Sequence, residues 1–592
     1  MRKNIIRFFV MNMMTASLFG AVVIKGSDGN FTLERNGKPY FIKGGGGGGP
    51  KDLLAEVGGN SFRTWGAGTA QKELDIAQKN GLTATIRFWF GHQQHGFDYS
   101  NPAALEKQKE DVLKVVRRLK DHPALLMWAL GNEMEIGNQH REEMWKHIDD
   151  VAKAVKAIDP NHPIMTVVAE IPDRNVREFN RFCPSVDILG INTYGGSASI
   201  GERYRKAGGV KPYIITEFGP PGQWEVGKTS FGCPREMTST EKAKWYADVY
   251  KKTIEGERNK LCLGSYAFTW GHKVEATPTW YGLLLPDNTR LGATDALQEC
   301  WTGKGPANRC PEISHIKVSR DDVKEAGGTL TAEATAKDPD GDKLTWKWVL
   351  VKEASTYAVT GTGEPTPPGF PEAIIKGQGT SRVEVKLPGG GKFRLYAYVF
   401  DGKGSGAYAN IALQGTGAVA VESKQPQRLP FYVYANGAPE TWYASGYMGN
   451  TGAIQMDLTH GKNPHSGDTC IKVSYNASDN WAGVLWQHPA NDWGEQDGGF
   501  NLKGAGTLVF WARGEKGGEK VSFKVGSIQN AKYSDTVIAE LKDIKLKTEW
   551  TRYRIPLDGR DLTRVKTGFG WVVANPGESI TFYLDDIYYT AD

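Results

Sequence analysis

The chain has 592 residues, too many for one hydrophobic core, so several domains are expected. Its 72 basic residues nearly balance 67 acidic ones, leaving a net charge of +5 without the Lys/Arg clustering of a nucleic-acid surface. Aromatic residues make up 11% of the chain and include 18 Trp, whose flat rings suit the C–H faces of sugars, although most are expected to be core residues.

The first 21 residues have the pattern of an export signal. Arg2, Lys3 and Arg7 precede an apolar stretch over 8–21 that is too short to span a bilayer comfortably. We therefore expect a signal peptide over 1–21 and a protein that is secreted, periplasmic or bound at the cell surface, with no membrane-spanning segment. The pattern gives no indication of oligomeric state.

Six cysteines in an exported chain could form disulfides, and their spacing matches no zinc motif. Cys300 and Cys310 are the most plausible pair, because only a small loop separates them.

From residue 38 to 302 the chain alternates eight times between short apolar strands and amphipathic helices, which predicts a (β/α)₈ barrel domain over 22–303. The expected helices include Gln71–Lys79, Leu105–Lys120, Arg141–Ile158 and Ser239–Ile254. The expected strands are Pro39–Lys43, Ser61–Trp65, Thr83–Phe90, Ala124–Leu130, Ile164–Val168, Val186–Asn192, Tyr213–Thr216 and Gly264–Trp270.

A doubly wound sheet is the alternative fold, but no Gly-x-Gly-x-x-Gly fingerprint follows the first strand. The six glycines from Gly44 to Gly49 lack the Lys-Ser/Thr of a phosphate-binding loop. We expect them to form a loop at the mouth of the barrel, floppy or closely approached by its neighbours.

Two of the apolar strands end abruptly at a glutamate, one at Glu133 and one at Glu217. The carboxyl ends of barrel strands meet at one face, where such barrels carry their reacting groups. Two carboxylates there could act as the acid and the nucleophile of a glycosidase. The alternative is a pair of exposed glutamates in ion pairs or helix caps.

At these residues the chain resembles glycoside hydrolase clan A, the retaining (β/α)₈ β-glycosidases. The resemblance covers about half of the chain and implies that Glu133, after Asn132 at the end of strand four, is the acid/base. It implies that Glu217, at the end of strand seven, is the nucleophile. By the same resemblance Arg63 and Tyr194 contact the nucleophile.

In such a mechanism Glu217 attacks the anomeric carbon while Glu133 protonates the leaving oxygen and later deprotonates water. Asn132 would bind the sugar 2-hydroxyl. Nearby cations would hold Glu217 ionised, and repulsion from that charge would raise the pKa of Glu133.

Other residues are candidates for binding substrate at the same mouth. His92 could bind a sugar hydroxyl or have a structural role, and Trp270 could lie under the sugar at the cleavage point. Trp65, Trp89, Trp224 and Trp280 could extend the cleft, although each is more often a packing residue. Glu135, just behind the acid/base, is expected in a solvated loop or in a supporting role. The clan needs no metal or cofactor, and none is predicted.

Residues 311–416 contain short alternating strands and Gly/Pro turns typical of an immunoglobulin-like sandwich. The segment from Asp338 to Trp348 resembles the polycystic-kidney-disease and cadherin-like spacer modules of secreted enzymes. The three acids Asp338, Asp340 and Asp342 could hold calcium, but a plain turn is favoured.

Residues 428–592 are again all-β and resemble jelly-roll carbohydrate-binding modules related to galactose-binding domains. Trp442, Trp481, Trp486 and Trp493 lie in Gly/Asn/Asp-rich surroundings, and one or two are expected to be exposed for stacking on a sugar.

These patterns together predict a secreted retaining β-glycoside hydrolase with a carbohydrate substrate, and a β-glucan is favoured. A transglycosylase with the same two glutamates is one alternative, and a non-catalytic carbohydrate-binding protein is another.

Overall fold

The computed structural model describes residues 20–323, 328–354, 357, 367, 369–415, 426–435, 441–531 and 533–592. The predicted signal peptide lies outside the described residues except for its last two positions. The chain divides into two compact units, one up to Ala420 and the other from Val421.

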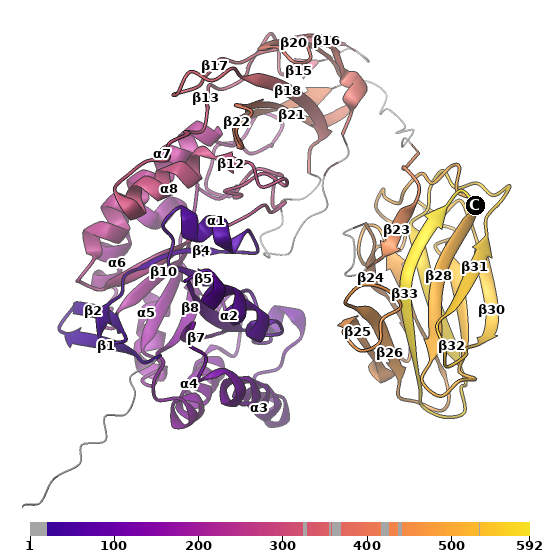
Figure 1. Cartoon of the computed structure of the whole chain (residues 1–592), viewed down its shortest axis with the longest axis horizontal. Helices are drawn as coiled ribbons and strands as arrows, with labels where there is room; N and C mark the ends of the chain where they lie inside the picture. The colour runs from indigo at the N-terminus through magenta and orange to yellow at the C-terminus, as the bar shows by residue number, and fades with distance from the viewer. Residues whose placement is uncertain are drawn as a thin grey trace, which may run out of the picture. The chain divides into compact units, whose positions relative to one another are not determined.

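Eight parallel strands form a closed barrel in the first unit, in the order β4 to β11, which confirms the predicted (β/α)₈ fold (Figure 1). Their bounds are β4 Ile42–Gly46, β5 Ser61–Arg63, β6 Thr83–Phe88, β7 Leu125–Leu130, β8 Ile164–Ala169, β9 Ile188–Asn192, β10 Tyr213–Phe218 and β11 Cys262–Phe268. Nearly every strand residue is buried, as expected of a sheet covered on both faces.

Helices surround the barrel and bury an apolar stripe against it. They are α1 Lys51–Glu56, α2 Ala70–Lys79, α3 Pro102–Leu119, α4 Arg141–Ile158, α5 Asp173–Phe182, α6 Ile200–Lys206, α7 Ser239–Val249 and α8 Gly292–Thr302, with a π-helical turn at Tyr250–Ile254 and short 3₁₀ turns at Gln93–His95, Gly195–Ser199 and Glu255–Glu257. None of the helices in the described ranges is long and apolar enough to cross a membrane.

The first barrel strand differs from the prediction, because it begins at Ile42 and includes Gly44, Gly45 and Gly46. A Cβ on Gly44 would lie 2.4 Å from the Tyr266 ring, and one on Gly45 would lie 2.7 Å from the Cβ of Trp270. Glycine is needed here because neighbouring rings occupy the space of a side chain, so these three positions are strand and not loop.

An antiparallel ribbon precedes the barrel, formed by β1 Val22–Ser27, β2 Asn30–Arg35 and β3 Lys38–Pro39. Val22 and Leu33 of this ribbon share a buried cluster with Ile42 and Leu126 of the barrel interior. The ribbon therefore covers the end of the barrel where the strands begin.

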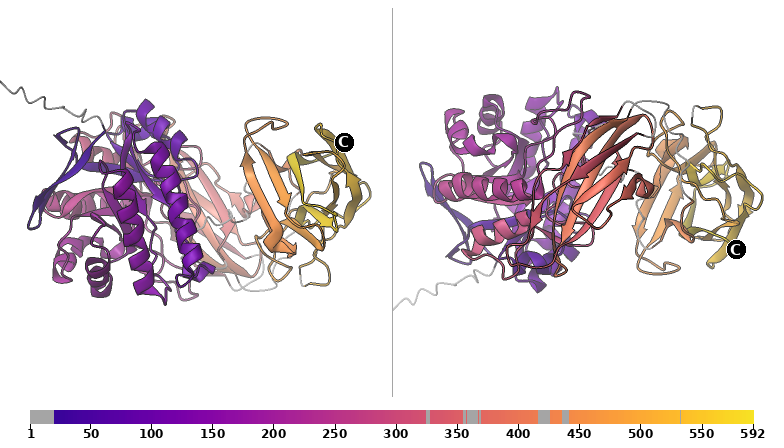
Figure 2. Two further views of the ribbon diagram at one scale, coloured as in Figure 1. Left: turned by 90° about the horizontal axis from the view of Figure 1, so that it is seen from below. Right: turned by 90° about the horizontal axis from the view of Figure 1, so that it is seen from above.

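A β-sandwich follows the barrel and packs on it (Figures 1 and 2). One sheet contains β12 Arg290–Leu291, β22 Ser405–Gly415, β21 Gly391–Phe400 and β18 Thr345–Lys352, with β15 Asp322–Val323 beside β22; the other contains β14 Lys317–Val318, β16 Thr329–Glu333, β20 Arg382–Lys386 and β19 Ile374–Lys376; β13 Glu312–Ile313 pairs with β17 Ala336–Lys337, and a 3₁₀ turn lies at Pro371–Ala373. The strand β12 lies directly before helix α8 of the barrel and pairs with β22 of the sandwich, so a segment of the barrel domain forms part of a sandwich sheet.

The acidic turn of the sandwich contains Asp338 and Asp342, whose carboxylates lie within 4.8 Å of each other and of Asp401. Asp338 Oδ1 accepts the backbone N–H groups of Asp340 and Asp342, and Lys403 pairs with Asp342 at 2.7 Å. These contacts are those of a hydrogen-bonded turn neutralised in part by a lysine.

The second unit is a pair of antiparallel sheets around one apolar core. One sheet has the order β25 Ile454–His460, β26 Cys470–Tyr475, β33 Ile580–Thr590, β28 Thr507–Gly514 and β31 Thr551–Pro556, with β23 Phe431–Tyr434 beside β33; the other has β24 Tyr443–Gly449, β27 Trp481–Gln487, β32 Thr567–Ala574, β29 Lys520–Val525 and β30 Ala539–Lys545, and a 3₁₀ turn lies at Thr451–Ala453. Trp442 and Trp486 are buried, whereas Trp481 and Trp493 are each 43% exposed, so two of the four tryptophans could stack on a ligand.

The predicted pairing of Cys300 with Cys310 is wrong, because all six cysteines, each within the described residues, are free thiols. The backbone N–H of Cys310 bonds Asp295 in the first turn of α8, whereas Cys300 lies near the last turn of that helix. The helix therefore holds the two thiols at opposite ends, in spite of the short loop between them.

Candidate active site

Glu217 is the penultimate residue of β10, at the carboxyl end of the strand. It is 8% exposed and its carboxylate accepts two side-chain hydrogen bonds. Arg63 Nη1 donates to Oε1 at 2.9 Å, and the Tyr194 hydroxyl donates to Oε2 at 2.9 Å. The structure therefore places Arg63 and Tyr194 on the two oxygens of one carboxylate, as the sequence resemblance implies.

Glu133 follows β7 and has a left-handed backbone, with φ at +54°. Its N–H bonds the carbonyl oxygen of Val167 on the neighbouring strand at 2.8 Å, which holds this unusual conformation. Asn192 Nδ2 donates to its Oε1 at 2.8 Å. Burial, and next the charge of Glu217, raise the pKa of Glu133 to about 7, although the Asn192 hydrogen bond opposes this.

Asn132 links the two glutamates through its side-chain oxygen. Arg63 Nη2 donates to Asn132 Oδ1 at 2.6 Å, and Asn192 Nδ2 donates to the same atom at 3.2 Å. Because the oxygen is occupied, the amide N–H groups are what Asn132 can offer to a sugar hydroxyl.

Asn192, which no motif in the sequence singles out, is the residue that joins these groups. It ends β9 and lies opposite Glu217 in the strand register. Its Oδ1 accepts a hydrogen bond from the Thr216 hydroxyl at 2.7 Å, which turns its Nδ2 toward Glu133 and Asn132. The available signal was its position at the carboxyl end of a barrel strand, the same signal that selected the two glutamates.

Arg87, also not selected, is a buried guanidinium beside both carboxylates. It is 7% exposed, and its Nε donates to the Trp65 carbonyl at 2.8 Å. Burial, the charge of Arg63 and weaker opposing effects of Glu217 and Glu133 lower the pKa of Arg87 to about 10. Among the described residues no carboxylate lies within ion-pairing distance of it.

An aromatic cluster forms one side of the site, built on Phe268, Trp280 and Tyr281 with Tyr194 and Trp65 packed against it. The Tyr194 and Tyr281 ring centroids lie 5.3 Å apart, so the phenol that contacts Glu217 is held by a buried neighbour. Outside this cluster, Trp224 is 51% exposed and packs edge-on against Tyr194 at 6.0 Å, while Trp89 is 59% exposed.

The remaining predicted residues lie deeper than expected. Trp270 is 1% exposed and its indole N–H bonds the Pro50 carbonyl oxygen at 2.8 Å, so its ring is a packing element of the first strand and offers no open face. His92 is 9% exposed and lies 5.5 Å from the exposed Trp89 ring. Burial is the main cause that lowers the pKa of His92, which favours a neutral imidazole.

Glu135 is buried and supports the loop that carries the acid/base, so a solvated position is excluded. Its Oε1 accepts the Ala169 backbone N–H at 2.7 Å and an N–H of Asn175 at 3.2 Å. Burial raises its pKa to about 8, which keeps the carboxyl largely neutral at pH 7. Glu135 ties the loop after β7 to the end of β8 and to helix α5.

Together these residues form a pair of unlike carboxyls at the mouth of the barrel. The Glu217 carboxylate accepts hydrogen bonds from a guanidinium and a phenol, whereas Glu133 is poised to carry a proton near neutral pH. A site of this kind can donate a proton on one side of a bond while a carboxylate attacks on the other.

Comparisons with known proteins give matches over two parts of the chain. Residues 53–246 match the family model "Glycosyl hydrolases family 2, TIM barrel domain", and residues 431–591 match "Carbohydrate binding domain 30". The β-glucuronidase of Paenibacillus borealis is 26% identical over 192 residues, which is 28% of this chain and 30% of the relative. Human β-glucuronidase is 27% identical over 244 residues, 38% of this chain and 35% of the relative.

The chain therefore spans about a third of the length of these two curated relatives. Among solved structures, Bacteroides uniformis β-glucuronidase 2 aligns over 96% of this chain and 68% of that chain, with 14% identity and a TM-score of 0.38. In the barrel, then, the chain is similar to family 2 glycosyl hydrolases, and at its C-terminal end it is similar to a family of carbohydrate-binding domains.

Proposed function

We propose that the protein is a retaining β-glycoside hydrolase, with Glu217 as the nucleophile and Glu133 as the acid/base. The observation that carries the proposal is the opposite treatment of the two carboxyls. Arg63 and Tyr194 stabilise charge on Glu217, whereas burial and the charge of Glu217 favour the protonated form of Glu133.

In the first step, an oxygen of Glu217 bonds to the anomeric carbon as the glycosidic bond breaks. Glu133 gives its proton to the leaving oxygen, so the aglycone departs as a neutral alcohol. The products of this step are a glycosyl ester on Glu217 and an ionised Glu133.

In the second step, Glu133 takes a proton from water, whose oxygen attacks the anomeric carbon and releases Glu217. Two inversions give net retention at that carbon. Asn132 donates to the sugar 2-hydroxyl, a contact that strengthens as positive charge develops on the ring.

For the substrate we favour a β-linked polymer, with a β-glucan as the first expectation from the sequence. The C-terminal match to a carbohydrate-binding domain supports a polymer, because a tethered binding module raises the local concentration of a chain more usefully than that of a disaccharide. With the predicted signal peptide, this describes an exported enzyme of polysaccharide breakdown.

A second substrate class is a β-glucuronide. The matched relatives are β-glucuronidases, and Arg87 is a buried cation beside the two glutamates with no carboxylate partner among the described residues. A uronic acid would bring a carboxylate into the site, and a buried guanidinium favours such a group.

The experiment is a substrate panel followed by size and reducing-end analysis of the products. The purified protein, its Glu217→Ala variant and a Glu143→Gln control on the exposed face of α4 are incubated with β-1,3-, β-1,4-, β-1,6- and β-1,2-glucans, mannan, galactan and an aryl β-glucuronide. Release of sugar by the parent and the control, but not by Glu217→Ala, is expected for one class of substrate.

Other outcomes would favour the alternatives. Products longer than the substrate would indicate transfer to a sugar hydroxyl in place of water, which uses the same two glutamates. Equal activity in the parent and in Glu217→Ala would refute the assigned nucleophile. Glycan binding without any turnover would favour a carbohydrate-binding protein.

A further inference from the structure

We propose that the β-sandwich is a positioning part of the active site, in which Tyr408 and Tyr357 hold the aromatic wall that fixes Tyr194 against Glu217. The aromatic wall is the cluster of Phe268, Trp280 and Tyr281 described above. The inference rests on the proposed function for its catalytic consequence. It assigns the sandwich a role that a spacer module would not have.

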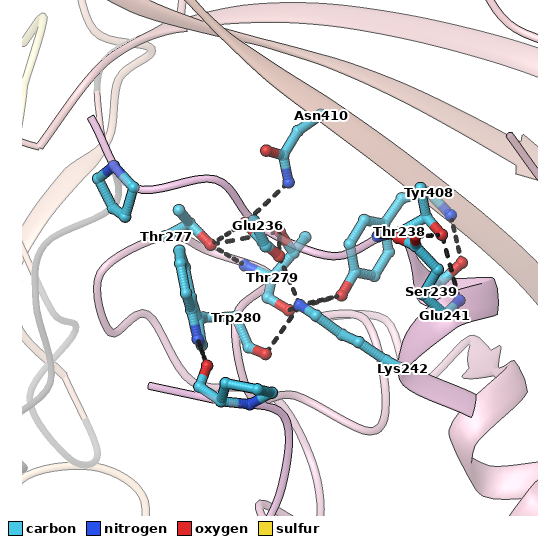
Figure 3. A network of polar contacts seen from close by, with 12 residues as sticks. Glu236, Thr238, Ser239, Glu241, Lys242, Thr277, Thr279, Trp280, Tyr408 and Asn410 are labelled. Atoms are coloured by element: carbon cyan, nitrogen blue, oxygen red, sulfur yellow. Dashed lines mark hydrogen bonds and ion pairs between the residues drawn. The ribbon is translucent and has the colours of Figure 1, made fainter. Parts of the chain in front are cut away.

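A buried lysine lies at the junction of barrel and sandwich (Figure 3). Lys242, on α7, donates to the hydroxyl of Tyr408 on β22 at 2.8 Å and to the carbonyl oxygens of Thr279 and Trp280 at 3.0 and 2.8 Å. Tyr408 in turn donates to the Thr279 carbonyl oxygen at 2.7 Å. One ammonium and one phenol thus bind the same short loop that follows β11.

A buried carboxylate neutralises this lysine. Glu236 pairs with Lys242 at 2.6 Å and accepts the hydroxyls of Thr277 and Thr279 at 2.7 and 2.9 Å. Asn410, on β22 of the sandwich, donates to Glu236 Oε2 at 2.7 Å, the oxygen that also accepts the Thr277 hydroxyl. Burial would raise the pKa of Glu236, but the charges of Lys242 and Arg394 outweigh it and hold the pKa below its usual range.

The same loop connects the sandwich to the catalytic residues. Trp280 and Tyr281 follow directly, and their side chains bond the loop after β10 through the Pro221 carbonyl oxygen and Gln223 at 3.0 and 3.1 Å. Tyr281 packs on Tyr194, whose hydroxyl donates to Glu217. The sandwich is therefore two side-chain contacts away from the phenol that orients the nucleophile.

The sandwich also contributes a residue that packs directly on the aromatic wall. Tyr357, which follows β18, packs against the cluster of Phe268, Trp280 and Tyr281. Its hydroxyl donates to Glu353 Oε1 at 3.0 Å, and Glu353 forms a buried two-bond pair with Arg394, both at 2.8 Å. Arg394 also donates to the Pro234 carbonyl oxygen of the barrel at 3.0 Å.

These contacts make the position of Tyr194 depend on residues more than a hundred positions downstream. Buried charged groups hold this geometry tightly because any movement leaves one of them without its partner. The wall would loosen if the Tyr408 hydroxyl were removed, and Tyr194 would then donate less effectively to Glu217.

The experiment compares Tyr408→Phe with Tyr396→Phe in the full chain. The Tyr396 hydroxyl is buried in the same sandwich and has no hydrogen-bond partner among the described residues, so this variant controls for the loss of an oxygen. On the substrate found by the panel, kcat/KM of Tyr408→Phe is expected to fall about tenfold or more, since small misplacements at a reacting centre are costly. The loss should appear in kcat and leave KM nearly unchanged, because Tyr194 acts on the nucleophile.

Hydrogen exchange followed by mass spectrometry tests the same inference without turnover. In Tyr408→Phe, the amides of residues 276–283 should exchange faster than in the parent and in Tyr396→Phe. A Tyr357→Ala variant provides a second test if Tyr408→Phe does not fold, with the same expectation for kcat/KM and for kcat.

The outcomes separate the two hypotheses. Faster exchange with unchanged kcat and kcat/KM would overturn the positioning role, and so would unchanged exchange over 276–283. A parent without activity on every substrate would contradict the proposed function. The exchange comparison would then still decide whether the sandwich holds this wall.

Discussion

Asn192 donates a hydrogen bond to Glu133 at 2.8 Å, so the acid/base that follows β7 is held by a side chain at the end of β9. That bond favours the ionised form of Glu133, whereas burial and the charge of Glu217 favour the protonated form. The balance gives a carboxyl with a pKa of about 7, a value suited to giving and then taking a proton near neutral pH.

The first prediction concerns the alkaline limb of activity. Because Glu133 must be protonated for the first step, kcat/KM should fall as pH rises through about 7. In Asn192→Ala the bond that stabilises the anion is absent, so the limb should move to higher pH. Initial rates between about pH 4 and pH 10 would measure the alkaline limb of both proteins. An unshifted limb in Asn192→Ala would contradict the assignment.

The second prediction concerns the acid/base itself. Glu133→Gln should lose most of its activity on an alkyl or sugar leaving group, by about a hundredfold or more. With an aryl leaving group that departs without protonation, the first step should be largely retained and the glycosyl ester on Glu217 should accumulate. Intact-mass spectrometry after mixing would detect that ester; equal losses on both kinds of substrate would argue against proton donation by Glu133.

The third prediction concerns the nucleophile. Glu217→Gln keeps the shape of the side chain and removes its charge, so kcat should fall by about a thousandfold or more. Glu143→Gln makes the same chemical change at an exposed position of α4 and should leave kcat unchanged. Polarimetry or NMR of the first product of the parent should give retained configuration, and an inverted product would exclude the double displacement.

The fourth prediction concerns stability at the junction of barrel and sandwich. Arg394→Met removes one member of a buried ion pair and leaves the Glu353 carboxylate without its partner. The free energy of unfolding of the first unit should fall by about 3–5 kcal/mol. Arg382→Met, which breaks an exposed pair with Glu333, should change it by about 1 kcal/mol or less, and equal effects in denaturant titrations would contradict the buried role.

The fifth prediction concerns the thiols. All six cysteines should react with a thiol reagent after denaturation without reductant, since none forms a disulfide. Most are buried, so the native protein should react slowly. A count of four thiols in the denatured protein would show that one pair had formed.

The sequence predicted the parts of the site that follow from strand ends. Glu133 and Glu217 each come after an apolar run, and a parallel barrel brings such positions to one face. Arg63, Asn132 and Tyr194 could be added because they stand in recognisable motifs, and the structure joins them to the glutamates.

Other features depend on space that one sequence does not reveal. Gly44 and Gly45 had the appearance of a loop, but the rings that require glycine there are Tyr266 and the distant Trp270. Because Trp270 packs on these glycines, it is buried in the barrel and does not lie under the sugar as the sequence predicts.

The junction with the sandwich was equally hidden. Lys242 and Tyr408 are 166 positions apart, and each alone has the pattern of an ordinary surface or strand residue. A charged side chain in an amphipathic helix usually faces water, and only the tertiary fold shows that this one does not.

The left-handed backbone of Glu133 has a consequence for how the chain can change. A glutamate at φ of +54° carries a conformational cost of about 1–3 kcal/mol that glycine would not have. Selection for thermal stability alone would therefore favour glycine at position 133 and discard the acid/base. A screen for more stable variants of this protein should measure turnover at every round, because one gain in stability lies at the residue that its proposed chemistry requires.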